Sequence, residues 1–469
     1  MRRAILALAA LAAAGCADDG QPFSDTGARD SRADGIGAQA PPSIDGKFTD
    51  WAAIGKLASD PTGDATGGFD LTMVKATSRG TLLYLYFAVG KVLNAHAGPT
   101  AEGTLRLELA LPAGRHLTLD LRDRKAYADN DASQALRWSA IGYRIAPTHA
   151  GREFEIRIDL KSLGVKVGDA ISINFDGSDR LAGPAQLSLT GPTVTPDRRS
   201  PSRGAGTVIR VASLNTWLDG LVDPSRSASL GRLVKAVAAD IYCFQEVLGA
   251  SSSTIADTLR TIDPHGDGAA WNAQQHGDLI IASRASLRAL PDASSQQTFT
   301  AAALEISGTK LVVFTLRPVC CGYVGSAEDQ SRIAEAKQLA ATIKLLRGGQ
   351  LGSELDPWRQ APLVVVGDWN LVGSRTPVDV LADPTGSALT HWQLRHLLGD
   401  DTFTWRNDND TGRFPPGMLD LLLHSPALGA RSGFVLDSGD LDGATASKLG
   451  LLAKDSQASD HLLLVADFE

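Results

Sequence analysis

Residues 363–370 of this 469-residue chain read LVVVGDWN, an apolar run that ends in polar residues. A short continuous run of aliphatic residues predicts a buried β-strand. Asp368 and Asn370 stand two positions apart at its end, and on extended backbone such side chains point the same way. A carboxylate and an amide placed together could bind and orient a water molecule. Alone, the Asp-x-Asn pattern is more often a turn cap, so it needs partners elsewhere in the chain.

Polar residues stand at the ends of four more predicted strands in the second half of the chain. They are Asn215 after residues 208–214, Glu246 after 241–244, Asp420 before 421–423, and Asp460 with His461 before 462–465. Each of them alone is an ordinary strand-end residue. Helical spacing over 230–239 and 330–346 predicts an α+β domain with helices covering its sheets. The five groups together, in this order, indicate one functional site.

These motifs resemble the endonuclease/exonuclease/phosphatase superfamily of metal-dependent phosphoesterases. The resemblance spans residues 207–469, and it is carried by LNTW at 214–217, FQEV at 244–247, GDWN at 367–370, TFTW at 402–405, MLDLLL at 418–423 and SDH at 459–461. It implies a four-layer α/β/β/α sandwich, in which two β-sheets pack face to face and helices cover the outside. The motifs are specific for the superfamily and unspecific for the substrate.

The resemblance and the chemistry of these residues imply a metal site. Glu246, with Asn215 close by, is expected to hold Mg²⁺ or Mn²⁺, because hard cations prefer oxygen ligands and keep positions open for phosphate. Asp460 is expected to be a second metal-binding or orienting carboxylate. Such an ion neutralises charge on the phosphoryl oxygens and can activate water.

The catalytic residues follow from the same resemblance. Asp368 and Asn370 are expected to position the attacking water, and His461 to contact the scissile phosphate or transfer a proton. Asp420 is expected to orient His461 through a hydrogen bond to a ring nitrogen, which favours the imidazolium form. No cysteine or serine nucleophile is required, so we expect direct attack by water without a covalent intermediate.

One residue of the superfamily pattern is missing. Many relatives carry a histidine at the end of the strand that corresponds to residues 312–317, and here that position falls on Thr315 or Arg317. Arg317 could steady the leaving oxygen by its charge, but its pKa is too high for ready proton donation. His391 and His396 fall in a stretch with helical spacing and are expected to be exposed to solvent.

Residues 43–190 carry short alternating strands separated by Gly, Pro and Asp clusters, which predicts an antiparallel β-sandwich. The opening IDGKFTDW at 44–51, with the later acidic loops and LYLYF at 83–87, resembles family-nine carbohydrate-binding modules. The resemblance implies glycan binding through an aromatic face. Trp51 is a candidate for that face, but a core position is favoured. A cluster of Asp60, Asp64 and Asp70 either binds Ca²⁺ or forms a solvated loop.

The N-terminus has the layout of an export signal. Arg2 and Arg3 precede an apolar stretch that ends in Ala13-Ala14-Gly15-Cys16, which resembles a bacterial lipobox. We therefore expect a lipoprotein signal peptide at 1–16, acylation of Cys16, and a disordered tether at 17–42. The alternative is an ordinary cleaved signal. Residues 191–206, rich in Pro and Gly, are expected to be a linker.

The four cysteines do not form a disulfide framework. Cys243 lies in an apolar run and is expected to be a buried thiol, whereas the adjacent Cys320 and Cys321 leave a strained vicinal disulfide open. The net charge of -8, with acidic residues in excess from Thr207 onward, argues against a dedicated nucleic-acid coat but not against a nuclease, because a metal ion can supply positive charge locally.

The sequence thus predicts an exported, monomeric bacterial lipoprotein, anchored on the periplasmic or cell-surface side of a membrane. The expected activity is Mg²⁺-dependent hydrolysis of phosphodiester or phosphomonoester bonds, of the nuclease, phospholipase/sphingomyelinase or phosphatase type. The alternative is a non-catalytic surface glycan-binding protein that retains a degenerate phosphoesterase fold. Loss of metal-dependent hydrolysis in Glu246→Ala separates the two.

Overall fold

The computed structural model describes residues 40–95, 103–192, 195–264, 270–291, 298–407 and 414–469. Residues 40–469 form one compact unit. The predicted signal peptide with Cys16, and nearly all of the predicted tether, lie outside the described residues. Within the described parts, no helix is long and apolar enough to cross a membrane.

The C-terminal sandwich, from β12 to β23, contains two six-stranded sheets that pack against each other. The first has the order β14-β15-β13-β12-β23-β22 and the second β16-β17-β18-β19-β21-β20. The strands of the first are Ile209–Asn215 (β12), Ile241–Gln245 (β13), Asn272–His276 (β14), Leu279–Ser283 (β15), Ala430–Leu436 (β22) and Leu463–Phe468 (β23). Those of the second are Arg288–Ala289 (β16), Phe299–Ile306 (β17), Thr309–Leu316 (β18), Leu363–Asp368 (β19), Thr390–His391 (β20) and Asp420–His424 (β21).

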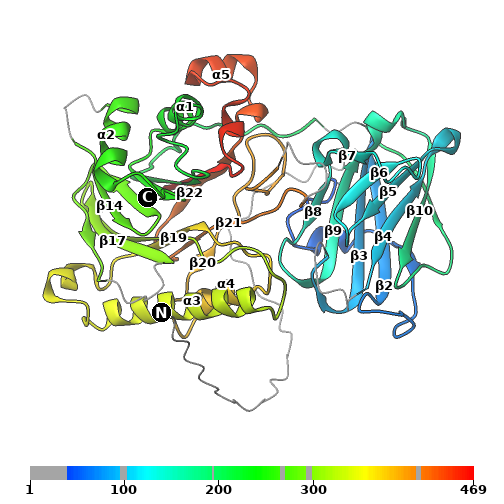
Figure 1. The fold of residues 1–469 in the computed structure, drawn as a ribbon, viewed down its shortest axis with the longest axis horizontal. Coiled ribbons are helices and arrows are strands. Elements are labelled where there is room, and N and C mark those ends of the chain that lie inside the picture. Colours follow the sequence, from blue (N-terminus) through cyan, green and yellow to red (C-terminus); the bar gives the residue numbers. More distant parts are fainter. Residues whose placement is uncertain (1–39, 96–102, 193–194, 265–269, 292–297, 408–413) are drawn as a thin grey trace, which may run out of the picture. The chain divides into compact units, whose positions relative to one another are not determined.

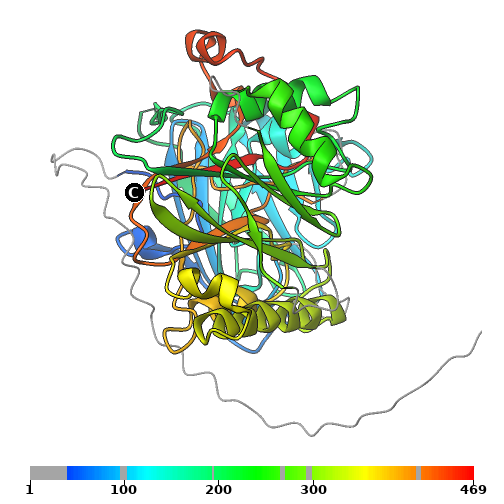
Figure 2. The ribbon, with the colours of Figure 1, turned by 90° about the vertical axis from the view of Figure 1, so that its left-hand side faces the viewer.

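Helices cover the outer face of each sheet. They are Ser227–Val237 (α1), Ser252–Ile262 (α2), Ala327–Arg347 (α3) and Thr376–Ala382 (α4). A further helix, Gly443–Leu449 (α5), has no buried residue. In Figure 1, α1 and α2 lie on one side of the paired sheets and α3 and α4 on the other, and Figure 2 shows the same layers edge-on. The predicted four-layer sandwich is confirmed.

Alternation along β19 shows why these residues form a central strand. Val364 and Val366 pack between the two sheets, whereas Leu363 and Val365 face the helix layer. Both faces are buried, which accounts for the continuous aliphatic run. Glycine is required at position 367, where β19 pairs with β18, because a Cβ there would lie 2.3 Å from the carbonyl oxygen of Leu316. The run therefore places Asp368 at the edge where the sheet opens.

The N-terminal sandwich, from β1 to β11, is entirely antiparallel, as expected. Its sheets have the orders β1-β2-β3-β9-β8 and β11-β10-β4-β5-β6-β7. The strands of the first are Lys56–Ser59 (β1), Leu71–Arg79 (β2), Leu82–Leu93 (β3), Arg144–Ala146 (β8) and Gly151–Asp159 (β9). Those of the second are Leu105–Ala110 (β4), His116–Asp120 (β5), Lys125–Ala128 (β6), Ala135–Leu136 (β7), Ala170–Gly177 (β10) and Ala185–Ser188 (β11).

Trp51 belongs to the core of this sandwich and not to a sugar-binding face. Its side chain is 1% exposed, and its Nε1 donates a hydrogen bond to Glu155 Oε2 at 2.7 Å. The acidic cluster also differs in part from the expectation, since Asp179 joins Asp60 and Asp64. Asp70 instead accepts a hydrogen bond from the backbone nitrogen of Gly63 at 2.8 Å.

The prediction that His391 and His396 are helical and exposed to solvent was wrong. His391 pairs in β20 with β21, and no helix covers His396, which is 2% exposed. The two ring nitrogens of His396 lie 2.9 Å from Asp440 Oδ2 and 2.9 Å from the carbonyl oxygen of Phe403. The helical spacing gave a wrong prediction here, because the apolar residues of this stretch are placed by contacts with segments distant in sequence and not by a helix.

The thiols and the predicted linker also have defined surroundings. Cys243 is buried, as expected, and Cys320 and Cys321 are exposed free thiols. The predicted linker runs against the C-terminal sandwich, where the backbone nitrogen of Arg199 donates to the carbonyl oxygen of Leu397 at 2.7 Å.

Candidate active site

The predicted site residues come from several strand ends that meet at one edge of the C-terminal sandwich. Asn215 ends β12, Glu246 follows β13, and these two strands are parallel. Asp368 ends β19 directly opposite Asp420, which begins the antiparallel β21. Carboxyl ends of parallel strands and amino ends of their antiparallel neighbours share one sheet edge, so side chains far apart in sequence become neighbours.

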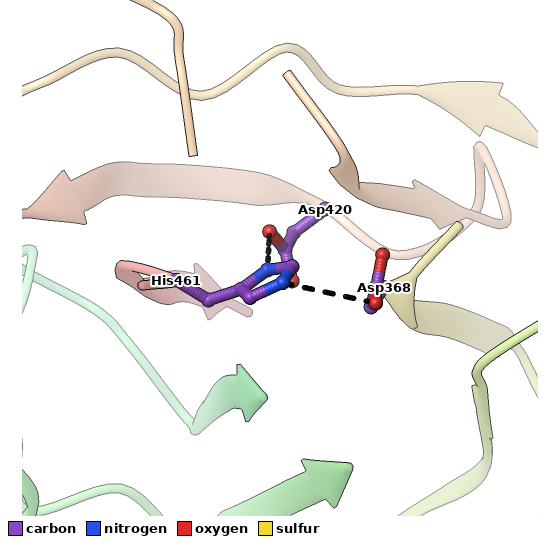
Figure 3. A group of neighbouring side chains, drawn as sticks. All are labelled: Asp368, Asp420 and His461. Carbon is purple, nitrogen blue, oxygen red and sulfur yellow. Dashed lines mark hydrogen bonds and ion pairs between the residues drawn. The ribbon is translucent and has the colours of Figure 1, made fainter. Parts of the chain in front are cut away.

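His461 lies between two carboxylates. Its Nδ1 is 2.8 Å from Asp420 Oδ2 and its Nε2 is 3.8 Å from Asp368 Oδ2. Figure 3 shows the imidazole held between Asp420 on one side and Asp368 on the other. All three side chains are buried. The hydrogen bond predicted between Asp420 and His461 is therefore present in the structure.

The charges of this group favour a protonated imidazole. Burial alone would lower the pKa of His461, but the carboxylates of Asp420 and Asp368 outweigh it and raise the pKa. Burial raises the pKa of Asp368, opposed by the charge of His461. The two carboxylates beside the ring therefore favour the imidazolium form of His461.

Asn215 and Glu246 form the second half of the site. The Asn215 Nδ2 donates to Glu246 Oε1 at 3.1 Å and to Asp368 Oδ2 at 3.2 Å. Its Oδ1 accepts from the backbone nitrogen of Trp217 at 3.0 Å. Glu246 has a φ of 60°, a strained conformation for a non-glycine residue. In this geometry Asn215 links the expected metal-binding carboxylate to the expected water-binding one.

Asn370 lies at the site, but its backbone conformation differs from the extended one that was predicted. Its φ of 48° is left-handed, so it does not continue the extended strand from Asp368. Its Nδ2 donates to Asp368 Oδ2 at 3.0 Å and to the carbonyl oxygen of Pro318 at 3.1 Å. The extended-backbone argument was wrong, although both side chains do line the same pocket.

Of the two residues at which the missing histidine was expected, Arg317 lines the pocket and Thr315 does not. Thr315 is fully buried and accepts a hydrogen bond from Gln245 Nε2 at 2.8 Å. Arg317 lines the pocket, with its Nε 2.6 Å from Asp278 Oδ2 and its Nη1 3.8 Å from Glu246 Oε1. The guanidinium is thus held beside the site by Asp278, a residue that the sequence did not single out.

Two further residues hold the site together and had no predicted role. The hydroxyl of Thr404 accepts from the backbone nitrogen of Asp420 at 2.8 Å. Trp405 Nε1 donates to Asp460 Oδ2 at 3.0 Å. Both belong to the TFTW run at 402–405, so the motif itself was the available signal.

A cavity of about 280 Å³ opens over these groups. Its charged lining residues are the carboxylates of Glu246, Asp368 and Asp460 and the cations Arg317 and His461. Asp420 lies directly behind His461, so the described groups carry more negative than positive charge.

A phosphate ester is itself negatively charged, so the excess negative charge of the pocket must be compensated before the ester can bind. Burial raises the pKa of Asp460, and the nearby charge of Glu246 adds to the effect. Two carboxylates that line one pocket, with further oxygen ligands beside them, fit a hard divalent cation. The residues present therefore suit the expected metal, with Glu246 and Asp460 as its carboxylates.

A second histidine–carboxylate pair, His396 with Asp440, has the same geometry as His461 with Asp420. Neither of its members is among the residues that line the cavity. Because it lies outside this cavity lining, the pair offers a matched comparison for the first.

The model of the Endonuclease/Exonuclease/phosphatase family matches residues 212–461. Among solved structures, the chain is similar to a 3' phosphatase from Neisseria bound to a product DNA hairpin, with 17% identity, 56% of this chain and 99% of that chain covered, and a TM-score of 0.38. For a mannosyl-6-phosphatase from Bacteroides thetaiotaomicron, the values are 14%, 56%, 99% and 0.38. For an AP endonuclease from Archaeoglobus fulgidus they are 13%, 56%, 99% and 0.37.

No protein of curated function matches the chain. The family match at residues 212–461 covers more than half of the sequence and contains every residue predicted for the site. The chain belongs to the endonuclease/exonuclease/phosphatase family.

Proposed function

We propose that the protein is a metal-dependent phosphoesterase that hydrolyses phosphodiester or phosphomonoester bonds by direct attack of water. The observation that carries the proposal is the buried group of Asp368, His461 and Asp420, whose ligand atoms all lie within 4.8 Å of one another. Asp368 and His461 line one pocket with Glu246 and Asp460, and Asp420 lies behind His461. Such a set combines water positioning, proton control and cation binding.

Asp368 is the residue proposed to hold the attacking water, and Asn370 and Asn215 fix its carboxylate through hydrogen bonds to Oδ2. His461 is proposed to meet a phosphoryl oxygen as an imidazolium, with Asp420 as its positioning residue. Arg317 is proposed to stabilise charge on the leaving oxygen. Its guanidinium cannot readily supply a proton, so protonation of the leaving group falls to solvent or to His461.

Glu246 and Asp460 are the residues proposed to hold Mg²⁺ or Mn²⁺, with Asn215 orienting Glu246. The bound ion would neutralise charge on the phosphoryl group. Removal of the ion would leave the excess negative charge of the pocket facing the substrate, so chelation is expected to abolish turnover.

The other expectations from the sequence remain part of the proposal. The protein is proposed to be exported and anchored through acylated Cys16, and its N-terminal sandwich to bind glycan. Ca²⁺ is proposed at Asp60, Asp64 and Asp179. The grouping of these carboxylates and the buried, unpartnered Asp60 Oδ2 support that site.

A non-catalytic glycan-binding protein is the competing function. The replacement of the superfamily histidine by Arg317 is the observation in its favour. The convergence of Glu246, Asp368, Asp460 and His461 on one cavity counts against it, because a site released from catalysis has no reason to hold four charged groups together, two of them buried at a cost.

The test is hydrolysis of bis-p-nitrophenyl phosphate, plasmid DNA and sphingomyelin with Mg²⁺, Mn²⁺ or EDTA. We expect turnover of at least one substrate, loss in EDTA, and loss in Glu246→Gln and His461→Ala. His396→Ala is the matched control and is expected to retain activity. Absence of turnover in folded protein would favour the glycan-binding function.

A further inference from the structure

The N-terminal sandwich supplies part of the wall of the active-site cavity. Asn94 and Thr148 are among the lining residues, together with groups of the C-terminal sandwich. Asn94 follows β3 and is 5% exposed, and Thr148 lies between β8 and β9. A module that served only to dock on glycan would have no need to reach the catalytic pocket.

Asn94 connects two loops that carry pocket residues. Its Nδ2 donates to the carbonyl oxygen of Val372, and its Oδ1 accepts from the backbone nitrogen of Val324 at 2.8 Å. Val372 follows Asn370 by two positions, and Val324 follows the lining residues Cys320 and Cys321. One carboxamide therefore uses both its donor and its acceptor to hold the two loops.

Thr148 holds a third segment of the wall. Its Oγ1 accepts from the backbone nitrogen of Met418 at 2.8 Å, next to the lining residues Gly417 and Leu419. A Cβ at Gly417 would lie 3.0 Å from Thr148 Cγ2, so the two chains approach as closely as glycine allows. This segment leads directly into Asp420. The position of Thr148 thus sets how far the wall stands from the catalytic group.

An ion network keeps this arrangement in place. Asp401 Oδ2 lies 2.9 Å from Arg144 Nε, and Asp401 Oδ1 lies 2.7 Å from Arg157 Nη1. The three side chains are 14–21% exposed. Nearby, the backbone nitrogen of Ala150 donates to the carbonyl oxygen of Gly373 at 2.8 Å. Charge-assisted bonds in a largely desolvated setting favour one fixed docking geometry.

The chemistry of the cavity indicates what fits inside it. Its lining combines the polar groups described above with Trp405, Phe414, Pro415 and Leu419. Arg124 of the N-terminal sandwich stacks on Phe414, 4.1 Å from the ring centroid. About 280 Å³ is at the lower limit for a small-molecule site. A duplex, whose major groove alone is about 12 Å wide, needs an open surface instead.

We propose that the wall formed by Asn94 and Thr148 restricts this active site to small phosphate esters with an apolar or aromatic organic group, and excludes duplex nucleic acid. The N-terminal sandwich is then a specificity element of the enzyme. The inference rests on the proposed phosphoesterase function and adds the substrate class to it.

The test compares three probes with the whole protein and Mn²⁺: methyl p-nitrophenyl phosphate, the bulkier bis-p-nitrophenyl phosphate, and supercoiled plasmid. The wild type is expected to hydrolyse the aryl esters and leave the plasmid intact. Thr148→Ala opens the wall, so kcat/KM for the bulkier ester should rise about 10-fold relative to the smaller one. Thr148→Ser keeps the hydroxyl and should bring this ratio back toward the wild-type value.

Asn94→Ala frees the two loops and should shift the ratio in the same direction. Asn174→Ala, on β10 of the same sandwich and outside the cavity lining, is the control and should leave it unchanged. Thermal unfolding checks that each variant is folded; if Asn94→Ala is not, Thr148→Ala decides alone.

Aryl-ester turnover with equally fast plasmid nicking, or with a ratio that neither wall variant alters, would overturn the inference and leave the phosphoesterase function standing. No turnover of any probe would overturn the function itself, and the inference with it.

Discussion

Replacement of Asp420 by asparagine tests the central pair of the proposed site. The substitution keeps the shape of the side chain and removes its charge. In the wild type, Asp420 Oδ2 lies 2.8 Å from Nδ1 of a histidine that is 6% exposed. Asparagine can accept from that nitrogen only weakly, and in its other orientation it presents a donor and favours the wrong tautomer.

The expected loss follows from the energy of that contact. A hydrogen bond to a charged group contributes about 1.5–3 kcal/mol. Each 1.36 kcal/mol added to the activation barrier slows the reaction tenfold, so kcat should fall about 10- to 150-fold.

The pH profile should change as well. Burial lowers the pKa of His461, and Asp420 is the first of the carboxylates that outweigh it and raise the pKa. A histidine with a raised pKa stays protonated until the pH passes that value. Without Asp420 the proton leaves at lower pH, so the alkaline limb of kcat should move down by about one unit or more.

The assay is kcat against pH for bis-p-nitrophenyl phosphate with saturating Mg²⁺, and Asp440→Asn is the matched control. Asp440 lies 2.9 Å from Nδ1 of the buried His396, outside the cavity lining. Both variants should lose stability to a similar extent, about 1–3 kcal/mol. Only Asp420→Asn should lose activity. A folded Asp420→Asn protein with kcat within twofold of wild type and an unmoved alkaline limb would refute the assigned role.

Three other outcomes are expected. Arg317→Ala should lower kcat/KM for esters with poor leaving groups more than for p-nitrophenyl esters, and Arg317→Lys should recover part of the lost kcat/KM. The measurement is kcat/KM across a series of leaving groups, and equal losses across the series would contradict the role of Arg317. Asp401→Asn should lower the free energy of unfolding, measured with urea at pH 7, by about 2–4 kcal/mol, because Arg144 and Arg157 lose their shared partner. Burial alone would raise the pKa of Asp401, but these guanidiniums hold that pKa below its usual range. The contribution of Asp401 to stability is therefore present above about pH 4 and is lost as the pH falls further. The stability cost of Asp401→Asn should shrink below that pH, and a cost independent of pH would contradict this assignment. Millimolar Ca²⁺ should raise the Tm of the wild type and not of Asp60→Asn; equal shifts would exclude the site.

The fold class was predictable because it depends on short-range patterns. Periods of two over residues 105–109 and 154–160 and the aliphatic run at 363–366 reflect which faces of a strand are buried, and burial is visible residue by residue. The strand-end positions of Asp368 and Asp420 followed directly, since the motifs adjoin the strands.

The details of the site were less predictable, because they depend on backbone conformation and on partners distant in sequence. Nothing near Asn370 signals its left-handed φ, and the placement of Arg317 at the pocket depends on Asp278, in the turn between β14 and β15. His396 was misjudged for the same reason, since its partner Asp440 lies on a later segment.

Periodicity and strand-end motifs are properties of consecutive residues, so the two sandwiches and the set of polar residues at one sheet edge could be predicted from the sequence. The entry of Asn94 and Thr148 into the active-site cavity could not be predicted in this way and is visible only in the folded chain. The hydrogen bonds that place them join residues more than two hundred positions apart. Such contacts depend on the relative placement of two separately formed sheets, which leaves no periodic trace in either segment.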